Sequence, residues 1–282
     1  MIIQWYPGHM TKSRRMMQEQ IALVDIVIEL LDARIPLSSR NPDIDQLAQN
    51  KRRLVILNKA DLADPDVTKE WETHYRSMGL RVLSVNSLEG KLANILYAES
   101  QNLMREKIRR EMQRGRKQVN MRAMVVGIPN VGKSTFINRI AGSASAVTGD
   151  RPGVTRGKQW IKVAKDFDLL DTPGVLWPKF EDESVGQKIA FTGAINDTIL
   201  DIITLSEAFI AWMMEKKPEL IISRYKISED MQNEIPRHVL EAIAMARGFK
   251  LKGDTLDLER TANTLLDEFR AGRLGRITLE SP

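Results

Sequence analysis

Ala123-Met-Val-Val-Gly-Ile-Pro-Asn-Val-Gly-Lys-Ser-Thr-Phe-Ile-Asn-Arg-Ile140 is the stretch that decides the fold. Its first four residues form an apolar run typical of a buried strand, and Thr135 to Ile140 has the apolar spacing of a helix. Between them stands Gly127-x-x-x-x-Gly132-Lys133-Ser134, the spacing of a phosphate-binding loop. A strand, a glycine-rich loop and a helix in this order predict an α/β domain.

The chemistry of such a loop follows from its backbone. Glycines let N–H groups turn inward toward phosphate oxygens, and the helix N-terminus favours negative charge. Lys133 would reach the β- and γ-phosphates, and Ser134 would ligate Mg²⁺. The remaining loop residues predicted to contact the nucleotide are Asn130, Val131, Gly132 and Thr135. The alternative is a chance match in a strand-turn-helix, and the loop alone does not distinguish GTP from ATP.

A second motif, Asn58-Lys59-Ala-Asp61, follows the apolar run Arg53 to Leu57 and points to guanine. The carboxylate of Asp61 can accept hydrogen bonds from guanine N1–H and the exocyclic amine, whereas adenine would leave it unpaired. Asn58 would fix the loop or touch the base, and the stem of Lys59 would lie over the ring. The alternative is an ordinary turn at a strand end. A third strand ends in a predicted base-supporting loop that contains Ser84, Asn86 and Ser87.

The third motif, Asp171-x-x-Gly174, also ends a predicted strand. Its carboxylate would hold Mg²⁺ through water, and the Gly174 amide would sense the γ-phosphate. Thr155, in the preceding loop, is the expected switch threonine whose hydroxyl completes the Mg²⁺ shell. Thr148 is a weaker alternative. The predicted metal ligands are therefore Ser134, Thr155 and Asp171.

The order of these motifs differs from that of an ordinary GTPase, in which the guanine motif comes last. Circular permutation is tolerated when a linker joins the old chain ends, and residues 92–121 would be that linker. In this order the chain resembles the circularly permuted GTPases, and among them those that assist assembly of the bacterial large ribosomal subunit. The matching segments are Trp5-Tyr-Pro-Gly-His-Met10, Asp32-Ala-Arg-Ile-Pro36, Asn58-Lys-Ala-Asp61, Gly127–Ser134, Pro152-Gly-Val-Thr155 and Asp171-Thr-Pro-Gly174.

The resemblance implies a fold and a set of domains. We expect a P-loop GTPase domain over residues 1–178, with a mostly parallel sheet flanked by helices and one antiparallel strand at 159–164. Helical periodicity prevails from about Pro178, so residues 179–282 should form an all-α domain. Helices are expected over residues 197–215, 218–225, 228–235, 236–247 and 256–271, with Pro218 and Pro236 in first helical turns. The domain should contact RNA or the ribosome, and because it is net acidic we expect that contact through a local patch, with these candidates: Arg237, His238, Arg247, Lys250 and Lys252.

The resemblance also bears on catalysis. Ordinary signalling GTPases place a glutamine after the glycine of the third motif to orient the attacking water, but this chain has Val175. His9 is the residue that the resemblance supports for that role, with Lys133 and Thr155 as its catalytic partners. Asn130 resembles the asparagine with which some GTPases hold K⁺ beside the phosphates. A turn histidine and a turn asparagine are the respective alternatives.

Composition narrows the partners and the compartment. The chain has no cysteine, which excludes disulfides and thiolate metal sites and fits a reducing compartment. Neither a signal peptide nor a membrane span is evident, so we expect a cytoplasmic protein. Residues 1–178 carry 28 Lys and Arg against 19 Asp and Glu, whereas residues 179–282 carry 14 against 18. The excess concentrates between Arg105 and Arg122 and predicts a polyanionic partner, with a solvated helix face as the alternative.

Together these features predict a GTPase that binds GTP and GDP with Mg²⁺, with K⁺ as a further cofactor if Asn130 holds it. It would act as a switch in large-subunit assembly, contact rRNA and ribosomal proteins, and be a monomer off the ribosome. Two rivals remain: a GTPase acting on another RNA such as tRNA, and a non-hydrolysing RNA-binding module.

Overall fold

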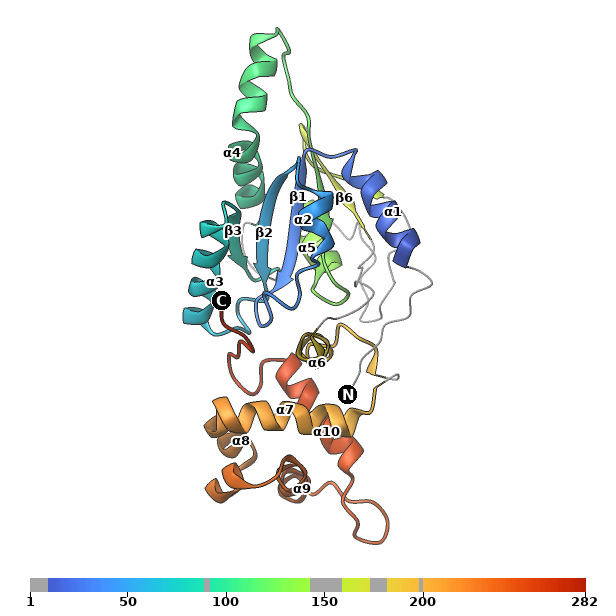
Figure 1. Cartoon of the computed structure of the whole chain (residues 1–282), viewed down its shortest axis with the longest axis vertical. Helices are drawn as coiled ribbons and strands as arrows, with labels where there is room; N and C mark the ends of the chain where they lie inside the picture. The colour runs from blue at the N-terminus through green and yellow to red at the C-terminus, as the bar shows by residue number, and fades with distance from the viewer. Residues whose placement is uncertain (1–9, 89–91, 143–158, 173–181, 198–199) are drawn as a thin grey trace. The chain divides into compact units, whose positions relative to one another are not determined.

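The structure, a computed structural model, describes residues 10–88, 92–142, 159–172, 182–197 and 200–282 (Figure 1). Within this part of the chain there are two compact units. One holds the described residues up to Thr172 together with Thr278–Pro282, and the other holds those from Asp182 to Ile277. None of the described helices is both long and apolar enough to span a bilayer.

A six-stranded sheet forms the centre of the first unit, in the order β3-β2-β1-β4-β6-β5. Its strands are β1 (Ile26–Asp32), β2 (Arg52–Asn58), β3 (Arg81–Val85), β4 (Met121–Val126), β5 (Gln159–Ala164) and β6 (Phe167–Asp171). Neighbouring strands pair in parallel except β5, which runs antiparallel to β6. The predicted mostly parallel sheet, with its antiparallel strand at 159–164, is confirmed.

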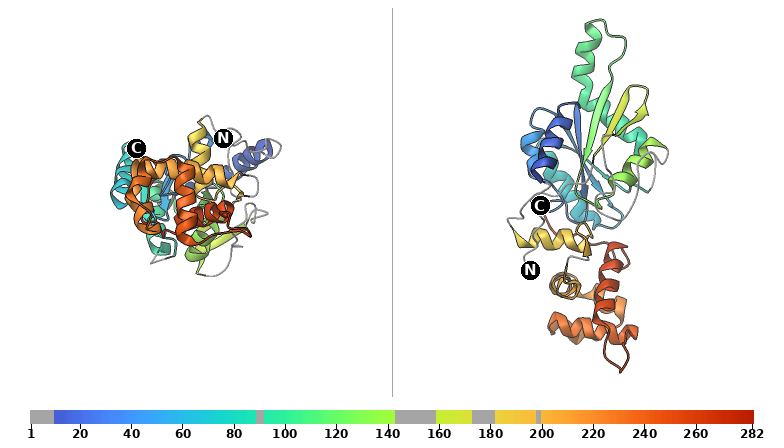
Figure 2. Two further views of the ribbon diagram at one scale, coloured as in Figure 1. Left: turned by 90° about the horizontal axis from the view of Figure 1, so that it is seen from below. Right: turned by 90° about the vertical axis from the view of Figure 1, so that its right-hand side faces the viewer.

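Helices cover both faces of this sheet. They are α1 (Met10–Ile21), α2 (Asp43–Leu47), α3 (Pro65–Ser77), α4 (Leu92–Gln113) and α5 (Lys133–Ala141). In the right-hand view of Figure 2 the blue helices lie on one side of the sheet and the green ones on the other. All seven residues of β1 are buried, which explains why this strand reads as an apolar run without alternation.

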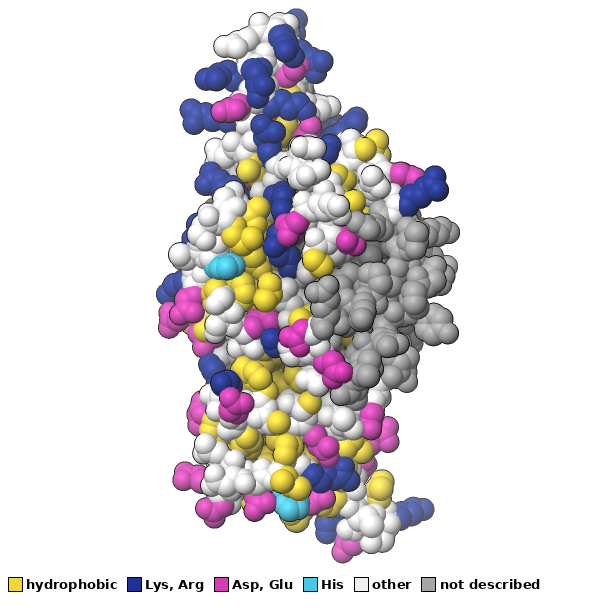
Figure 3. All heavy atoms as spheres, in the orientation of Figure 1, with side chains coloured by type: hydrophobic (Ala, Val, Ile, Leu, Met, Phe, Trp, Pro, Cys, Tyr) yellow, Lys and Arg dark blue, Asp and Glu magenta, His cyan; other side chains and the backbone are white. Residues whose placement is uncertain are grey.

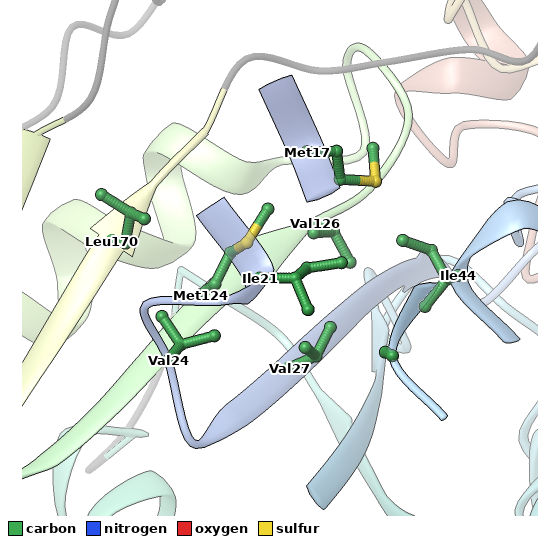
Figure 4. Close-up of a cluster of buried hydrophobic side chains, with 9 residues drawn as sticks. Met17, Ile21, Val24, Val27, Ile44, Met124, Val126 and Leu170 are labelled. Carbon is green, nitrogen blue, oxygen red and sulfur yellow. The ribbon is translucent and has the colours of Figure 1, made fainter. Parts of the chain in front are cut away.

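Helix α1 is held against the sheet by apolar packing. Met17 and Ile21 of the helix, with Val24 just after it, contact Met124 and Val126 of β4 (Figure 4). The same cluster includes Val27 and Leu170 from the strands on either side and Ile44 from α2. The helix that follows the N-terminal Trp5–His9 segment is thus fixed on the strand that leads into the phosphate-binding loop.

The topology brings the predicted motifs to one edge of the sheet. The parallel strands β1, β2, β3, β4 and β6 all end there, at Asp32, Asn58, Val85, Val126 and Asp171. The chain runs from β1 outward through β2 to β3, then returns to place β4 on the other side of β1. This reversal makes a topological switch point, where ligands bind in open α/β sheets.

The second unit is helical in its described part. Its helices are α6 (Glu183–Phe191), α7 (Ile202–Lys216), α8 (Pro218–Tyr225), the 3₁₀ turn η3 (Glu229–Asn233), α9 (Pro236–Arg247) and α10 (Leu258–Arg270). Phe209 joins the core: its ring centroid lies 5.3 Å from that of Phe191 and 4.8 Å from that of Phe269. Buried Glu268 accepts hydrogen bonds from Arg224, Tyr225 and Arg247.

Two helices differ from the sequence expectation. Helix α7 begins at Ile202 rather than at 197, because Asp201 caps it by accepting the N–H groups of Ile203 and Thr204. Asp197 instead pairs with Arg270, at 2.6 Å between Oδ2 and Nη1. The expected helix 228–235 is only the 3₁₀ turn η3.

The end of the chain also departs from the expected domain 179–282. Residues Thr278–Pro282 belong to the sheet-containing unit and not to the helical one. The N–H of Leu279 donates to Arg34 O at 2.8 Å, and Trp71 Nε1 donates to Glu280 O at 3.0 Å. Hydrophobic periodicity could not reveal this, because the segment is short and its partners lie more than two hundred residues away.

Candidate nucleotide-binding site

The phosphate-binding loop joins β4 to α5, and its two glycines are required by close packing. A Cβ on Gly127 would meet the carbonyl oxygen of Leu30 at 2.5 Å. Gly132 has φ +98°, and a Cβ there would stand 2.6 Å from Asn58 Nδ2. The loop can hold this path beside β1 and β2 only because both positions lack a side chain.

Lys133 is the first residue of α5 and lies with its side chain buried. Its ammonium donates to the carbonyl oxygens of Gly127, at 3.1 Å, and Ile128, at 2.9 Å. Burial lowers the pKa of Lys133 to about 8, although the charge of Asp171 opposes the shift. The lysine is thus folded over the loop, with its charge poorly solvated.

Asn58 ties the guanine motif to the phosphate-binding loop. Its Nδ2 donates to Val131 O at 2.8 Å, while its Oδ1 accepts from Ser87 Oγ at 2.6 Å and Ser87 N at 3.3 Å. Since Asn58 is buried, these bonds are shielded from water. One side chain therefore joins three segments that are far apart in the sequence.

Lys59 makes the next link. It has φ +58°, and its Nζ donates to Asn130 O at 2.8 Å. Asn130 has φ +55°, so both residues occupy the left-handed region, which is costly for residues other than glycine. The Lys59 ammonium also lies 3.1 Å from Asp32 Oδ2, at the end of β1.

Asp61 is exposed at the end of this motif, where its carboxylate is open to a ligand. The neighbouring Ala60 N–H donates to Val85 O at 3.1 Å and so fixes the loop against the end of β3. An exposed carboxylate on a fixed loop can accept paired donors from a base edge.

The three residues of the predicted base-supporting loop contact different partners. Ser87 reaches Asn58, as described above, and Asn86 Oδ1 accepts the N–H of Leu88 at 3.0 Å within a turn. Ser84 lies within β3, and its hydroxyl donates to Glu72 of α3 at 2.5 Å. The Ser84 hydroxyl therefore contacts helix α3.

The expected metal ligands at described positions suit Mg²⁺ chemically. Asp171 is buried at the end of β6, close enough to Lys133 to affect its pKa, and Ser134 is the second residue of α5. A carboxylate, a hydroxyl and phosphate oxygens are the hard donors that Mg²⁺ prefers. Thr172 hydroxyl donates to Val125 O at 2.6 Å and so fastens the segment after Asp171 to β4.

Three predicted site residues, His9, Thr155 and Gly174, lie outside the described residues. The contacts above join the described positions Asn58, Lys59, Ser87, Asn130 and Val131. Lys133 bonds instead to two carbonyl groups of the phosphate-binding loop itself. Thr135 follows Ser134 in the first turn of α5.

Sequence reasoning missed the role of Asp32 and Arg34. The sequence indicates both only as part of the segment Asp32-Ala-Arg-Ile-Pro36, yet they form a buried ion pair with Arg34 Nη2 2.7 Å from Asp32 Oδ2. Asp32 stands in register with Asn58 across the β1–β2 pair. An acidic residue ending the strand beside the guanine motif was the available signal.

Comparison with known proteins places the chain in a class of proteins. Residues 122–239 match the family described as 50S ribosome-binding GTPase. Two structures of YlqF resemble the chain: a GDP-bound one (TM-score 0.68, 26% identity, 95% of this chain and 99% of that one) and a GNP-bound one from Thermotoga maritima (0.67, 25%, 96% and 98%). The chain is thus a guanine-nucleotide-binding GTPase with circularly permuted motifs.

Relatives in sequence narrow the class. Over 282 residues the chain is 45% identical to the ribosome biogenesis GTPase A of Bacillus pumilus, covering 100% of this chain and 99% of that protein. It is 48% identical to that of Priestia megaterium over 286 residues, covering 100% and 98%. The chain belongs to the ribosome biogenesis GTPase A family.

Proposed function

We propose that this GTPase acts as a switch in assembly of the large ribosomal subunit, and that it binds rRNA. In this cycle the GTP-bound form binds the maturing subunit, and hydrolysis to GDP and phosphate favours release. The observation that carries the proposal is full-length similarity to ribosome biogenesis GTPases, combined with a phosphate-binding loop physically joined to the Asn58–Asp61 motif.

The basic stretch supplies a surface for RNA. The outer end of α4 and the segment after it expose Arg105, Arg109, Arg110, Arg114, Arg116 and Lys117. Dark-blue side chains gather there in Figure 3. Glu106 and Glu111 pair with Arg110, Arg114 and Arg116. Exposed cations in this number, with few acids among them, favour contact with the phosphate backbone.

In the helical unit, a larger share of the basic side chains expected to contact rRNA pair with acidic side chains than in the stretch at the end of α4. Among the cations expected to contact rRNA, Arg237 pairs with Glu207, Arg247 with Glu268 and Lys250 with Asp254. His238 lies 2.7 Å from Glu234. Ion pairs of this kind reduce the charge available to phosphates, so this unit would contact the ribosome through local shape and Lys252 rather than through bulk attraction.

The nucleotide-binding residues take the roles expected from their chemistry. Asp61 recognises guanine, and Lys133 neutralises the β- and γ-phosphates. Ser134, Thr155 and Asp171 hold Mg²⁺, which supplies positive charge at the phosphates. His9 orients the attacking water, because Val175 cannot. Asn130 holds K⁺, and the exchange of K⁺ for Na⁺ in the hydrolysis assay would test that ion: an unchanged rate excludes it.

The decisive experiment is the rate of GTP hydrolysis with and without purified large subunits. We expect slow turnover alone and stimulation by large subunits, but not by small subunits or tRNA. Stimulation by tRNA would favour the tRNA rival, and slow turnover unaffected by any RNA would favour the non-hydrolysing module. Off the ribosome the protein should be a monomer, which sedimentation would check. Its expected compartment is the cytoplasm.

A further inference from the structure

Asp32 holds an unusual concentration of donors at the end of β1. Its Oδ1 accepts Arg34 Nε at 2.8 Å and Arg34 N at 3.1 Å, while its Oδ2 accepts Arg34 Nη2 at 2.7 Å. The fourth donor is the Lys59 ammonium, 3.1 Å from Oδ2. Both Asp32 and Arg34 are about 1% exposed.

The electrostatics make this carboxylate a permanent anion. Burial by itself raises the pKa of Asp32, but the charges of Arg34 and Lys59 and the hydrogen bonds from Arg34 outweigh it and hold the pKa well below its usual range. Asp32 is therefore ionised at neutral pH. Its charge is always present to attract Lys59.

The negative charge of Asp32 stabilises the partly buried ammonium group of Lys59. Burial lowers its pKa, Asp32 opposes that shift, and Arg34 adds to it. Besides Asp32, the Lys59 ammonium contacts the Asn130 carbonyl, in the phosphate-binding loop. The left-handed backbone at Lys59 and Asn130 also has to be held by its surroundings, because such conformations persist only when neighbouring contacts determine them.

We propose that Asp32, fixed by Arg34, is a positioning residue that holds Lys59 over the guanine ring and ties the guanine motif to the phosphate-binding loop. This rests on the proposed assignment of Asn58–Asp61 to guanine. Arg34 fixes the carboxylate through a bidentate pair, and the carboxylate fixes the lysine. Asp32 itself does not touch the nucleotide.

The test is GDP binding by Asp32→Asn, which keeps the shape but removes the charge. Loss of a charged hydrogen bond predicts roughly ten- to a hundredfold weaker binding. The matched control is Asp25→Asn: Asp25 precedes the other end of the same strand, and its carboxylate also pairs with a lysine, Lys107. That variant should bind GDP normally.

Two further readouts separate positioning from a general effect on folding. In a Lys59→Met background, Asp32→Asn should weaken GDP binding by less than about threefold, since the residue it positions is gone. Asp32→Asn should also weaken GDP and inosine diphosphate equally, because the exocyclic amine that distinguishes them faces Asp61. An undiminished loss in the Lys59→Met background, or a changed ratio of the two affinities, would overturn the proposal.

The failure of the guanine assignment would look different. Asp61→Asn should lower the GDP preference over inosine diphosphate, and an unchanged preference there would refute the assignment whatever Asp32 does. If Asp32→Asn does not fold, Arg34→Lys replaces it: this variant keeps the charge but loses the bidentate geometry. Arg34→Lys should weaken GDP binding less than Asp32→Asn does, and it should have no effect in the Lys59→Met background. A loss of GDP affinity that persists in that background would overturn the proposal.

Discussion

Ser38 Oγ donates a 2.6 Å hydrogen bond to Glu280 Oε2, across 242 residues of sequence. The other carboxylate oxygen accepts the N–H groups of Leu37 and Ser38. Glu280 thus caps the turn that follows the Asp32–Arg34 pair. The C-terminal segment is a structural part of the nucleotide-binding unit.

Glu280→Ala should therefore destabilise that unit by about 2–4 kcal/mol, because two backbone donors and a hydroxyl lose a charged acceptor. The free energy of unfolding would be measured by urea denaturation, with release of bound GDP as the signal for this unit. Glu229→Ala, which removes an exposed acid in the helical unit, is the control and should cost less than about 0.5 kcal/mol. Equal effects of the two substitutions would contradict the capping role.

Gly132→Ala should disrupt the site because its Cβ would press on Asn58 Nδ2. We expect hydrolysis to fall on the order of 100-fold or more, since small displacements at a reacting centre have effects of that size. Gly142→Ala is a matched control: φ is +67° and nothing lies within 4 Å of its Cβ. It should cost about 1–2 kcal/mol of stability while single-turnover hydrolysis remains normal.

Nucleotide affinity should fall with rising pH because of Lys133. The nucleotide-free pKa of about 8 means that the lysine loses its proton above that pH, whereas bound phosphates favour the charged form. GDP affinity should weaken about tenfold between pH 7 and 9, measured by titration. Lys133→Met, whose binding is weaker throughout, should lack this component; an identical pH slope in both proteins would refute it.

The same shift affects stability with the opposite sign. Between pH 8 and the ordinary lysine value of 10.5 the unfolded chain binds more protons than the folded one. The contribution of Lys133 to the stability of the nucleotide-free protein should therefore rise with pH in that window. Urea denaturation of the unsubstituted protein and of Lys133→Met at several pH values in this window would measure it, and an identical pH dependence of the two would contradict it.

His9→Ala should lower the subunit-stimulated rate by roughly 10²–10⁴-fold, as loss of a water-orienting group does, without changing GDP affinity. His74→Ala is the control, because His74 is not one of the predicted site residues. Its ring packs edge-on against Trp71 and Tyr75 of α3. Intact stimulation in His9→Ala would mean that a ribosomal group orients the water.

Replacing Arg105, Arg109 and Lys117 by glutamine should weaken binding to large subunits and reduce the slope of log K against log salt by about 2. A variant with the same loss of charge elsewhere, at the exposed Lys69, Arg76 and Arg81, is the control. Equal loss in the two variants would show that net charge, and not this surface, drives binding.

The sequence by itself determined the motifs, the sheet type and most elements. Each motif is a run of neighbours whose chemistry is local, so Gly127–Ser134 and Asn58–Asp61 could be assigned without coordinates. Strands buried on both faces appear as apolar runs, and α8 and α9 begin where Pro218 and Pro236 predict, because proline suits a first helical turn.

Only the tertiary structure decided which motif residues meet. Strand order and register place Asp32 beside Asn58 and its neighbour Lys59, direct Ser84 to Glu72, and bring Glu280 back to Ser38. These pairings join residues distant in the chain, and they depend on how strands and helices pack. Local propensity carries no information about such contacts, because they form only when the whole sheet has assembled.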